Sequence, residues 1–161
     1  MENKFQVLLI EDDILDVNIF QRTLRDDGDS FNLLVANTLA KGVKIIEEQA
    51  VDLVIVDPGL PDSNGAETIK QILVHSQNKP VIVLTGSDDE ELPIQAIELG
   101  AHDYLIKDTI DKQSLKRSMR YALQKNMILS ELKNKSRQSL IDSKKKTGNF
   151  GPGTLERLHI F

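Results

Sequence analysis

The chain of 161 residues contains no cysteine and no tryptophan, and aromatic residues make up only 4% of it. Without cysteine it can form no disulfide, no thiolate metal site and no thiol nucleophile. Its three histidines, His75, His102 and His159, show neither metal-ligand spacing nor a Ser-His-Asp grouping. Any metal ion would therefore be bound mainly by oxygen, which favours hard cations.

Long apolar runs and an excess of positive charge are also absent. No segment approaches membrane-spanning length, and the first apolar run meets Glu11, Asp12 and Asp13 at once, unlike a signal sequence. We therefore expect a cytoplasmic protein without a membrane partner. The net charge is −5, whereas affinity for nucleic acid depends on clustered Lys and Arg, so direct nucleic-acid binding is not expected.

The apolar residues that are present predict an α/β fold. Short apolar runs without polar alternation are typical of strands covered on both faces of a parallel sheet, and helical stripes lie between them. The sequence therefore predicts a doubly wound, five-stranded parallel sheet with strand order 2-1-3-4-5, flanked by five helices. The expected strands are Val7 to Ile10, Phe31 to Ala36, Leu53 to Val56, Val81 to Leu84 and Tyr104 to Ile106.

Two helices have features of their own. Pro93 lies inside the fourth helical pattern, where its ring would clash with a preceding turn, so that helix is predicted to begin near Pro93 rather than at Asp88. The fifth pattern begins near Asp111 and continues several turns beyond what one domain can bury. We expect a domain over residues 1–124, a helical extension over 125–140 and a flexible tail over 141–161.

The helical extension carries an apolar cluster of Met127, Ile128, Leu129 and Leu132. One interpretation is a solvated helix with incidental apolar residues. The other is a helix that pairs with a second copy or leads to an output module. We favour the second, because a sustained apolar cluster usually has a partner, and we expect a homodimer through this helix.

Carboxylates follow two of the predicted strands. Glu11 and Asp12 follow the first, and Asp57 follows the third, just before a loop rich in turn-forming residues. If these strands are neighbours, the three carboxylates share one crevice at the carboxyl edge of the sheet. Two unit charges 4 Å apart repel by roughly 4 kcal/mol at an effective dielectric of 20. A Mg²⁺ ion held by these oxygens and by the carbonyl of Gly59 would relieve that repulsion.

The fourth and fifth predicted strands end in Thr85 and Lys107. A hydroxyl, an ammonium, a cation site and a nucleophilic carboxylate are the groups needed to transfer a phosphoryl group to Asp57 and to neutralise its oxygens. Each residue alone is more often a turn, cap or surface residue. Their occurrence together at four strand ends favours the functional interpretation.

Four motifs, taken together, resemble the receiver domain of two-component response regulators over about residues 6–123. They are LIEDD at Leu9 to Asp13, IVDPGLPDSNG at Ile55 to Gly65, VLTG at Val83 to Gly86, and GAHDYLIK at Gly100 to Lys107. The resemblance implies a flavodoxin-like fold and a phosphoacceptor switch in a phosphorelay rather than an enzyme, apart from self-catalysed phosphorylation and dephosphorylation. It also implies a histidine kinase or phosphotransfer protein as donor.

The same resemblance implies roles for individual residues. Asp57 corresponds to the phosphorylated aspartate, and Glu11, Asp12 and the Gly59 carbonyl to the other ligands of Mg²⁺. By the same resemblance, Thr85 is the switch hydroxyl, Lys107 the phosphate-contacting lysine and Tyr104 the switch aromatic.

Two alternatives stay open. One is a hydrolase that acts through an aspartyl phosphate, but such enzymes typically place an acidic residue two positions after the nucleophile, where this chain has Gly59. The other is a docking module that has the fold but is not phosphorylated. That second alternative is disfavoured by the presence of all five residues that the chemistry needs, which are Glu11, Asp12, Asp57, Thr85 and Lys107.

Overall fold

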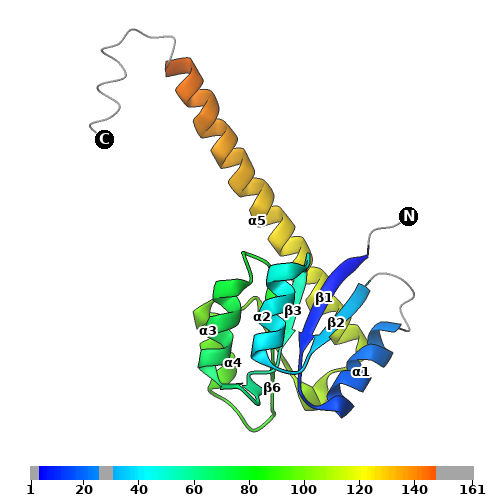
Figure 1. Cartoon of the computed structure of the whole chain (residues 1–161). Helices are drawn as coiled ribbons and strands as arrows, with labels where there is room; N and C mark the ends of the chain where they lie inside the picture. The colour runs from blue at the N-terminus through cyan, green and yellow to red at the C-terminus, as the bar shows by residue number, and fades with distance from the viewer. Residues whose placement is uncertain (1–3, 26–30, 148–161) are drawn as a thin grey trace. The chain divides into compact units, whose positions relative to one another are not determined.

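The structure is a computed structural model that describes residues 4–25 and 31–147. The chain divides into two compact units, Met1–Gln124 and Lys125–Phe161. The first unit contains a five-stranded parallel sheet, shown in Figure 1. Its strands, in the order β2-β1-β3-β6-β7, are β1 (Phe5–Ile10), β2 (Phe31–Ala36), β3 (Leu53–Val56), β6 (Val81–Thr85) and β7 (Asp103–Ile106).

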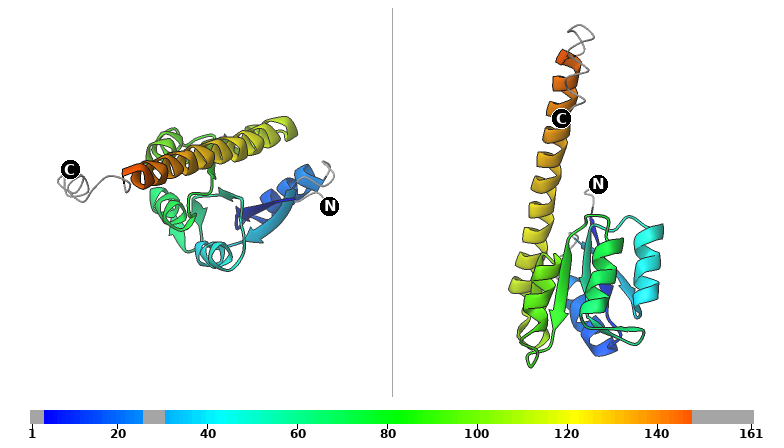
Figure 2. Two further views of the ribbon diagram at one scale, coloured as in Figure 1. Left: turned by 90° about the horizontal axis from the view of Figure 1, so that it is seen from above. Right: turned by 90° about the vertical axis from the view of Figure 1, so that its left-hand side faces the viewer.

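Helices cover both faces of this sheet, as Figure 2 shows. They are α1 (Ile14–Arg25), α2 (Leu39–Glu48), α3 (Ala66–His75), α4 (Leu92–Leu99) and the first turns of α5 (Lys112–Thr147), up to Gln124. Alternate residues of β1 point to opposite faces. Leu8 and Ile10 pack in a core with α2, α3 and α4, whereas Val7 and Leu9 pack in a second core with α1 and the start of α5. Both faces of the strand are therefore buried, which explains its unbroken apolar sequence.

The predicted fold class is confirmed. The fourth and fifth of the predicted strands correspond to β6 and β7, because the chain also forms two shorter strands that the sequence did not predict. These are β4 (Gly59–Leu60) and β5 (Ser63–Asn64), which pair antiparallel in the loop before α3. The predicted five-strand order is therefore the order that the structure has.

Side chains fix the beginnings of two helices. At the start of α2, the Thr38 hydroxyl accepts a hydrogen bond from the Lys41 N–H, and the Asp62 carboxylate accepts from the N–H groups of Leu39 and Ala40. These bonds satisfy backbone donors that have no partner within the helix. Helix α4 has Pro93 in its first turn, which confirms the predicted helix start.

Helix α5 extends to Thr147, so it continues past residue 140, where we expected the helical extension to end. Lysine is a good helix former, and the run Lys144 to Lys146 does not interrupt the helix as the prediction assumed. The rest of the predicted flexible tail, residues 148–161, lies outside the described residues. Within the described ranges, no helix is both long enough and apolar enough to cross a membrane.

Candidate functional site

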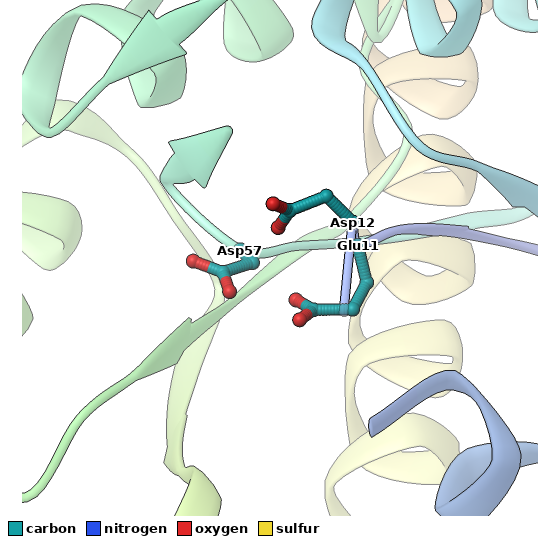
Figure 3. Close-up of side chains that lie close together, drawn as sticks. All are labelled: Glu11, Asp12 and Asp57. Atoms are coloured by element: carbon teal, nitrogen blue, oxygen red, sulfur yellow. The ribbon is translucent and has the colours of Figure 1, made fainter. Parts of the chain in front are cut away.

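The acidic residues meet because β1 and β3 are neighbours. Ile10 pairs with Val56 at the carboxyl ends of the two strands, and the Asp57 N–H donates to the Ile10 carbonyl at 2.9 Å. Glu11 and Asp57 are therefore the first residues beyond adjacent strand ends. Figure 3 shows that Asp12 lies beside them. The three carboxylates therefore lie close together at the carboxyl edge of the sheet.

The three carboxylates fit a divalent cation. Each of Glu11, Asp12 and Asp57 offers an oxygen within 4.8 Å of the oxygens offered by the others. Glu11 is only 1% exposed, and its Oε2 atom is buried without a hydrogen-bond partner. A buried carboxylate oxygen is costly when it has no partner. Hard oxygen ligands with one unsatisfied acceptor suit Mg²⁺.

The ammonium of Lys107 lies among these carboxylates. Its Nζ atom donates to Asp57 Oδ2 at 2.5 Å and to Glu11 Oε1 at 3.0 Å. It also donates at 3.0 Å to Oδ2 of Asp16, in the first turn of α1. A single positive charge therefore partly neutralises three carboxylates, each through a charge-assisted hydrogen bond.

The electrostatic environment shifts the pKa values of Glu11 and Asp57 in opposite directions. Burial and the neighbouring Asp57 charge raise the pKa of Glu11 to about 8, although Lys107 opposes this. Burial alone would also raise the pKa of Asp57, but the neighbouring Glu11 carboxyl and hydrogen bonds from Lys107 and the Gly59 N–H lower it below its ordinary value. Burial opposes the Lys107 charge, yet hydrogen bonds to Asp57, Asp16 and Glu11 raise the pKa of Lys107. Asp57 is therefore kept as a carboxylate, the nucleophilic form.

The loop after β3 holds Asp57 in place. The Gly59 N–H donates to Asp57 Oδ1 at 2.8 Å. Further along, Gly65 has φ 63°, a conformation that glycine adopts readily, and its N–H donates to the Pro58 carbonyl. The buried Thr68 hydroxyl donates to the same carbonyl at 2.9 Å. Backbone and side-chain hydrogen bonds from the start of α3 therefore fix the turn that carries Asp57.

Thr85 lines the same cavity as Asp57, and Tyr104 lines a different one. A cavity of about 500 Å³ is lined by Asp57, Gly59, Thr85 and other residues of the two adjoining loops. The buried Thr85 hydroxyl donates to the Leu105 carbonyl at a long distance of 3.5 Å. Tyr104 is 39% exposed and lines a different surface cavity. Of the two predicted switch residues, only Thr85 shares a cavity with Asp57.

Two contacts near the site were not predicted. One is the hydrogen bond from Lys107 to Asp16. In the sequence, Asp16 is only an acidic residue in the first turn of the helix that follows Glu11 and Asp12. The other joins the loops after β6 and β7, where the Ser87 hydroxyl donates to Asp108 Oδ2 at 2.7 Å. Asp16, Ser87 and Asp108 all lie outside the four sequence motifs, so these contacts become visible only in the folded structure.

The predicted self-association residues lie on α5 within the second unit. Met127, Ile128, Leu129 and Leu132 are all between 43% and 57% exposed. Their exposure agrees with a surface that could take a partner, and it does not identify that partner.

Comparison with known proteins finds relatives that are transcriptional regulatory proteins. The chain is 31% identical over 121 residues to transcriptional regulatory protein ZraR of Escherichia coli strain K12, covering 75% of this chain and 27% of that protein. It is 33% identical over 123 residues to transcriptional regulatory protein YdfI of Bacillus subtilis strain 168, covering 76% and 57%. The chain therefore spans less than two thirds of the length of either relative.

Solved structures of receiver domains are also similar to this chain. The signal receiver domain of an HD domain-containing protein from Pseudomonas fluorescens Pf-5 has a TM-score of 0.72 and 26% identity, covering 81% of this chain and 95% of that one. A response regulator receiver domain protein from Clostridium thermocellum has a TM-score of 0.69 and 28% identity, covering 78% and 98%. The family model for the response regulator receiver domain matches residues 7–134. The chain belongs to the response regulator receiver domain family.

Proposed function

We propose that this chain is a phosphoacceptor switch that receives a phosphoryl group on Asp57 from the phosphohistidine of a histidine kinase or phosphotransfer protein. One observation carries the proposal: the Asp57 carboxylate lies within hydrogen-bond distance of Lys107 and beside Glu11 and Asp12. A nucleophile, a fixed cation and a cluster of metal-binding oxygens are then in one place.

The proposed transfer needs no additional reactant. An oxygen of the Asp57 carboxylate attacks the phosphorus atom, the phosphorus–nitrogen bond of the phosphohistidine breaks, and its electron pair stays on the imidazole nitrogen. The product is an acyl phosphate. The low pKa of Asp57 favours the reaction because the attacking group is already ionised. The Lys107 ammonium is close enough to donate to the incoming phosphoryl oxygens.

Glu11, Asp12 and Asp57 are the side chains that would hold Mg²⁺, together with the Gly59 carbonyl that the resemblance implies. When bound, Mg²⁺ supplies positive charge that stabilises the negative oxygens of the transferred group. The unpaired Glu11 Oε2 supports this assignment.

The switch is proposed to involve Thr85 and Tyr104. The Thr85 hydroxyl has a single, long hydrogen bond to Leu105, on the strand that also carries Tyr104. A phosphoryl oxygen on Asp57 would be a stronger acceptor for that hydroxyl. Movement of Thr85 toward it would release the Leu105 carbonyl, and the exposed Tyr104 could then change position. The proposed output is control of a partner or of an output module.

The proposed self-association uses a stripe on α5 that lacks charge. On one face of the helix, Ile128, Leu129 and Leu132 are followed by the small or apolar residues Ser136, Ser139, Leu140 and Ser143, spaced by three and four residues. Met127, the other residue of the predicted cluster, lies outside this stripe by its helical spacing. The charged residues between Glu131 and Lys145 all lie outside this stripe. Pairing of this stripe with the same stripe of a second copy would bury the apolar residues and leave the charges in water.

Labelling with a small phosphodonor tests the proposed function. Phosphoramidate should phosphorylate the protein in the presence of Mg²⁺ and should do so poorly with a chelator. Glu11→Gln should require a higher Mg²⁺ concentration for the same labelling, because it replaces one carboxylate ligand by a weaker amide ligand. Steady release of phosphate from added phosphomonoesters would instead support the hydrolase alternative. Labelling that is unaffected by a chelator would contradict the proposed metal site.

A further inference from the structure

Asp16 contacts the proposed site through Lys107. It lies in the first turn of α1, and its Oδ2 atom accepts a hydrogen bond from Lys107 Nζ at 3.0 Å. The side chains of Asp16 and Lys107 are 27% and 24% exposed, so the pair is partly shielded from water. It is therefore better defined than a fully exposed ion pair.

The three protons of the Lys107 ammonium all have acceptors. An ammonium has three donors, and the three carboxylates that accept from Lys107 are Glu11, Asp16 and Asp57. The acceptors come from three elements of the chain: the end of β1, the first turn of α1 and the end of β3. The position of Nζ is thus fixed from three directions.

Two of these acceptors have other roles in the proposed reaction. Asp57 would become an acyl phosphate, and its carboxylate would lose its negative charge. Glu11 belongs to the group of carboxylates that could hold a metal ion, so its oxygens would coordinate Mg²⁺ when the ion is bound. Asp16 belongs neither to that group nor to the reacting atoms. It is therefore the acceptor that can hold Lys107 throughout the reaction.

We infer that Asp16 is a positioning residue, which holds the Lys107 ammonium beside Asp57 while Glu11 and Asp57 change partners. This inference rests on the proposed function and adds a residue that none of the four sequence motifs assigns a role. With Asp16 in place, Lys107 keeps one fixed bond and directs its remaining protons to the phosphoryl oxygens. Without it, the long lysine side chain gains rotamers, and fewer of them place Nζ near Asp57.

Two substitutions of Asp16 distinguish the effect of its acceptor oxygen from the effect of its negative charge. Asp16→Ala removes the acceptor, whereas Asp16→Asn keeps an oxygen of the same reach but removes the charge. The control is Glu98→Gln, which removes one exposed negative charge on α4, away from the cavity that Asp57 lines. Glu98 is not among the three carboxylates that accept from Lys107.

The first measurement is the rate constant of phosphorylation by phosphoramidate at saturating Mg²⁺. Loss of a residue that orients a site residue typically costs about 10- to 100-fold, so Asp16→Ala should be slower by about that factor. Asp16→Asn should keep most of the wild-type rate, and Glu98→Gln should match the wild type. An unchanged rate in Asp16→Ala would overturn the inference, as would an equal loss in Asp16→Asn or in Glu98→Gln.

The second measurement does not depend on phosphorylation. A ¹H–¹⁵N correlation spectrum of lysine ammonium groups should show a Lys107 signal in the wild type, because its hydrogen bonds slow proton exchange. The signal, assigned by its absence from Lys107→Met, should be unchanged in Asp16→Asn and broadened in Asp16→Ala, where only Glu11 and Asp57 still accept from the ammonium. Persistence of an unaltered signal in Asp16→Ala would overturn the inference. If the wild type accepted no phosphoryl group while the signal behaved as expected, the proposed function would fail and the positioning of Lys107 by Asp16 would stand.

Discussion

The Nζ atom of Lys107 lies 2.5 Å from Oδ2 of Asp57. The same ammonium donates to Glu11 and Asp16, so it acts as an internal cation within a group of carboxylates that would otherwise repel one another. Lys107 follows β7 and Asp57 follows β3, and β6 lies between these strands. The contact therefore depends on the correct assembly of the sheet.

Replacing Lys107 with methionine should make the protein depend more on a bound cation. The carboxylates would lose their fixed positive charge, so the melting temperature without metal should fall. The rise in melting temperature on adding Mg²⁺ should exceed that of the wild type, because the cation binds a more negative cluster and binding stabilises the folded state. Thermal unfolding with and without Mg²⁺ measures both quantities.

Lys112→Met is the matched control, since Lys112 is an exposed lysine at the start of α5. Lys112→Met should change the melting temperature without metal, and the response to Mg²⁺, much less than Lys107→Met does. An identical Mg²⁺ response in Lys107→Met and wild type would show that Lys107 does not neutralise the cluster.

Thr68→Val should destabilise the domain. Thr68 is fully buried, and its hydroxyl donates to the Pro58 carbonyl at 2.9 Å and lies 2.7 Å from the Ser63 hydroxyl. Valine has nearly the same shape but cannot donate, so a buried carbonyl loses a partner. Because the Pro58 carbonyl keeps its bond from the Gly65 N–H, we expect the free energy of unfolding to fall by about 0.5–1.5 kcal/mol, the value of one hydrogen bond, measured by urea denaturation.

Thr68→Ser keeps the hydroxyl and is the control for that experiment. Its loss of stability should be limited to that of one buried methyl group, about 1 kcal/mol. The interpretation fails if Thr68→Val is as stable as the wild type.

Asp62 should make stability depend on pH. Hydrogen bonds from the backbone N–H groups of Ala40 and Leu39 lower its pKa below the ordinary value of 3.8. A group whose pKa is lower in the folded state stabilises that state above its unfolded pKa, and this contribution is lost as the pH falls through the folded pKa. The difference in unfolding free energy between wild type and Asp62→Ala should therefore be present at about pH 6 and shrink below about pH 4.

Asp62 is exposed, so the effect should be small. A lost cap of this kind costs roughly 0.5–1 kcal/mol after screening is considered. Salt should reduce the difference at about pH 6. A difference that grew as the pH fell would contradict the assignment of Asp62 as a charged cap of α2.

Charges introduced into the uncharged stripe of α5 should prevent self-association. We expect the wild type to form a dimer in sedimentation velocity at high concentration and the double variant Leu129→Glu/Leu132→Glu to remain monomeric. Arg137→Glu changes charge outside the stripe and should still form a dimer. A wild type that stays monomeric, both with and without phosphorylation, would reject the proposed pairing.

Much of this fold could be predicted because the sheet is covered on both faces. Val7 to Ile10 and Leu53 to Val56 are buried throughout, so their runs have no polar interruption. The carboxyl ends of these parallel strands lie at one edge of the sheet, which made the meeting of Glu11 and Asp57 predictable as well.

Other features left no comparable signal. The strands β4 and β5 have two residues each, too few to show a hydrophobic period. Asp16 is an acidic residue in the first turn of a helix, which is common because it complements the helix dipole, and its partner Lys107 is 91 residues away. The end of α5 was placed too early because lysine occurs in exposed helices as readily as in flexible tails.

Intact-mass spectrometry of the wild type and Asp57→Asn after incubation with phosphoramidate and Mg²⁺ tests the central claim most directly. We expect the wild type to gain the mass of one phosphoryl group and Asp57→Asn to gain none, because an amide oxygen is a poor nucleophile. Asparagine has nearly the size of aspartate, and both proteins should have the same circular dichroism spectrum. Equal phosphorylation of the two proteins would contradict the assignment of Asp57 as the phosphoacceptor.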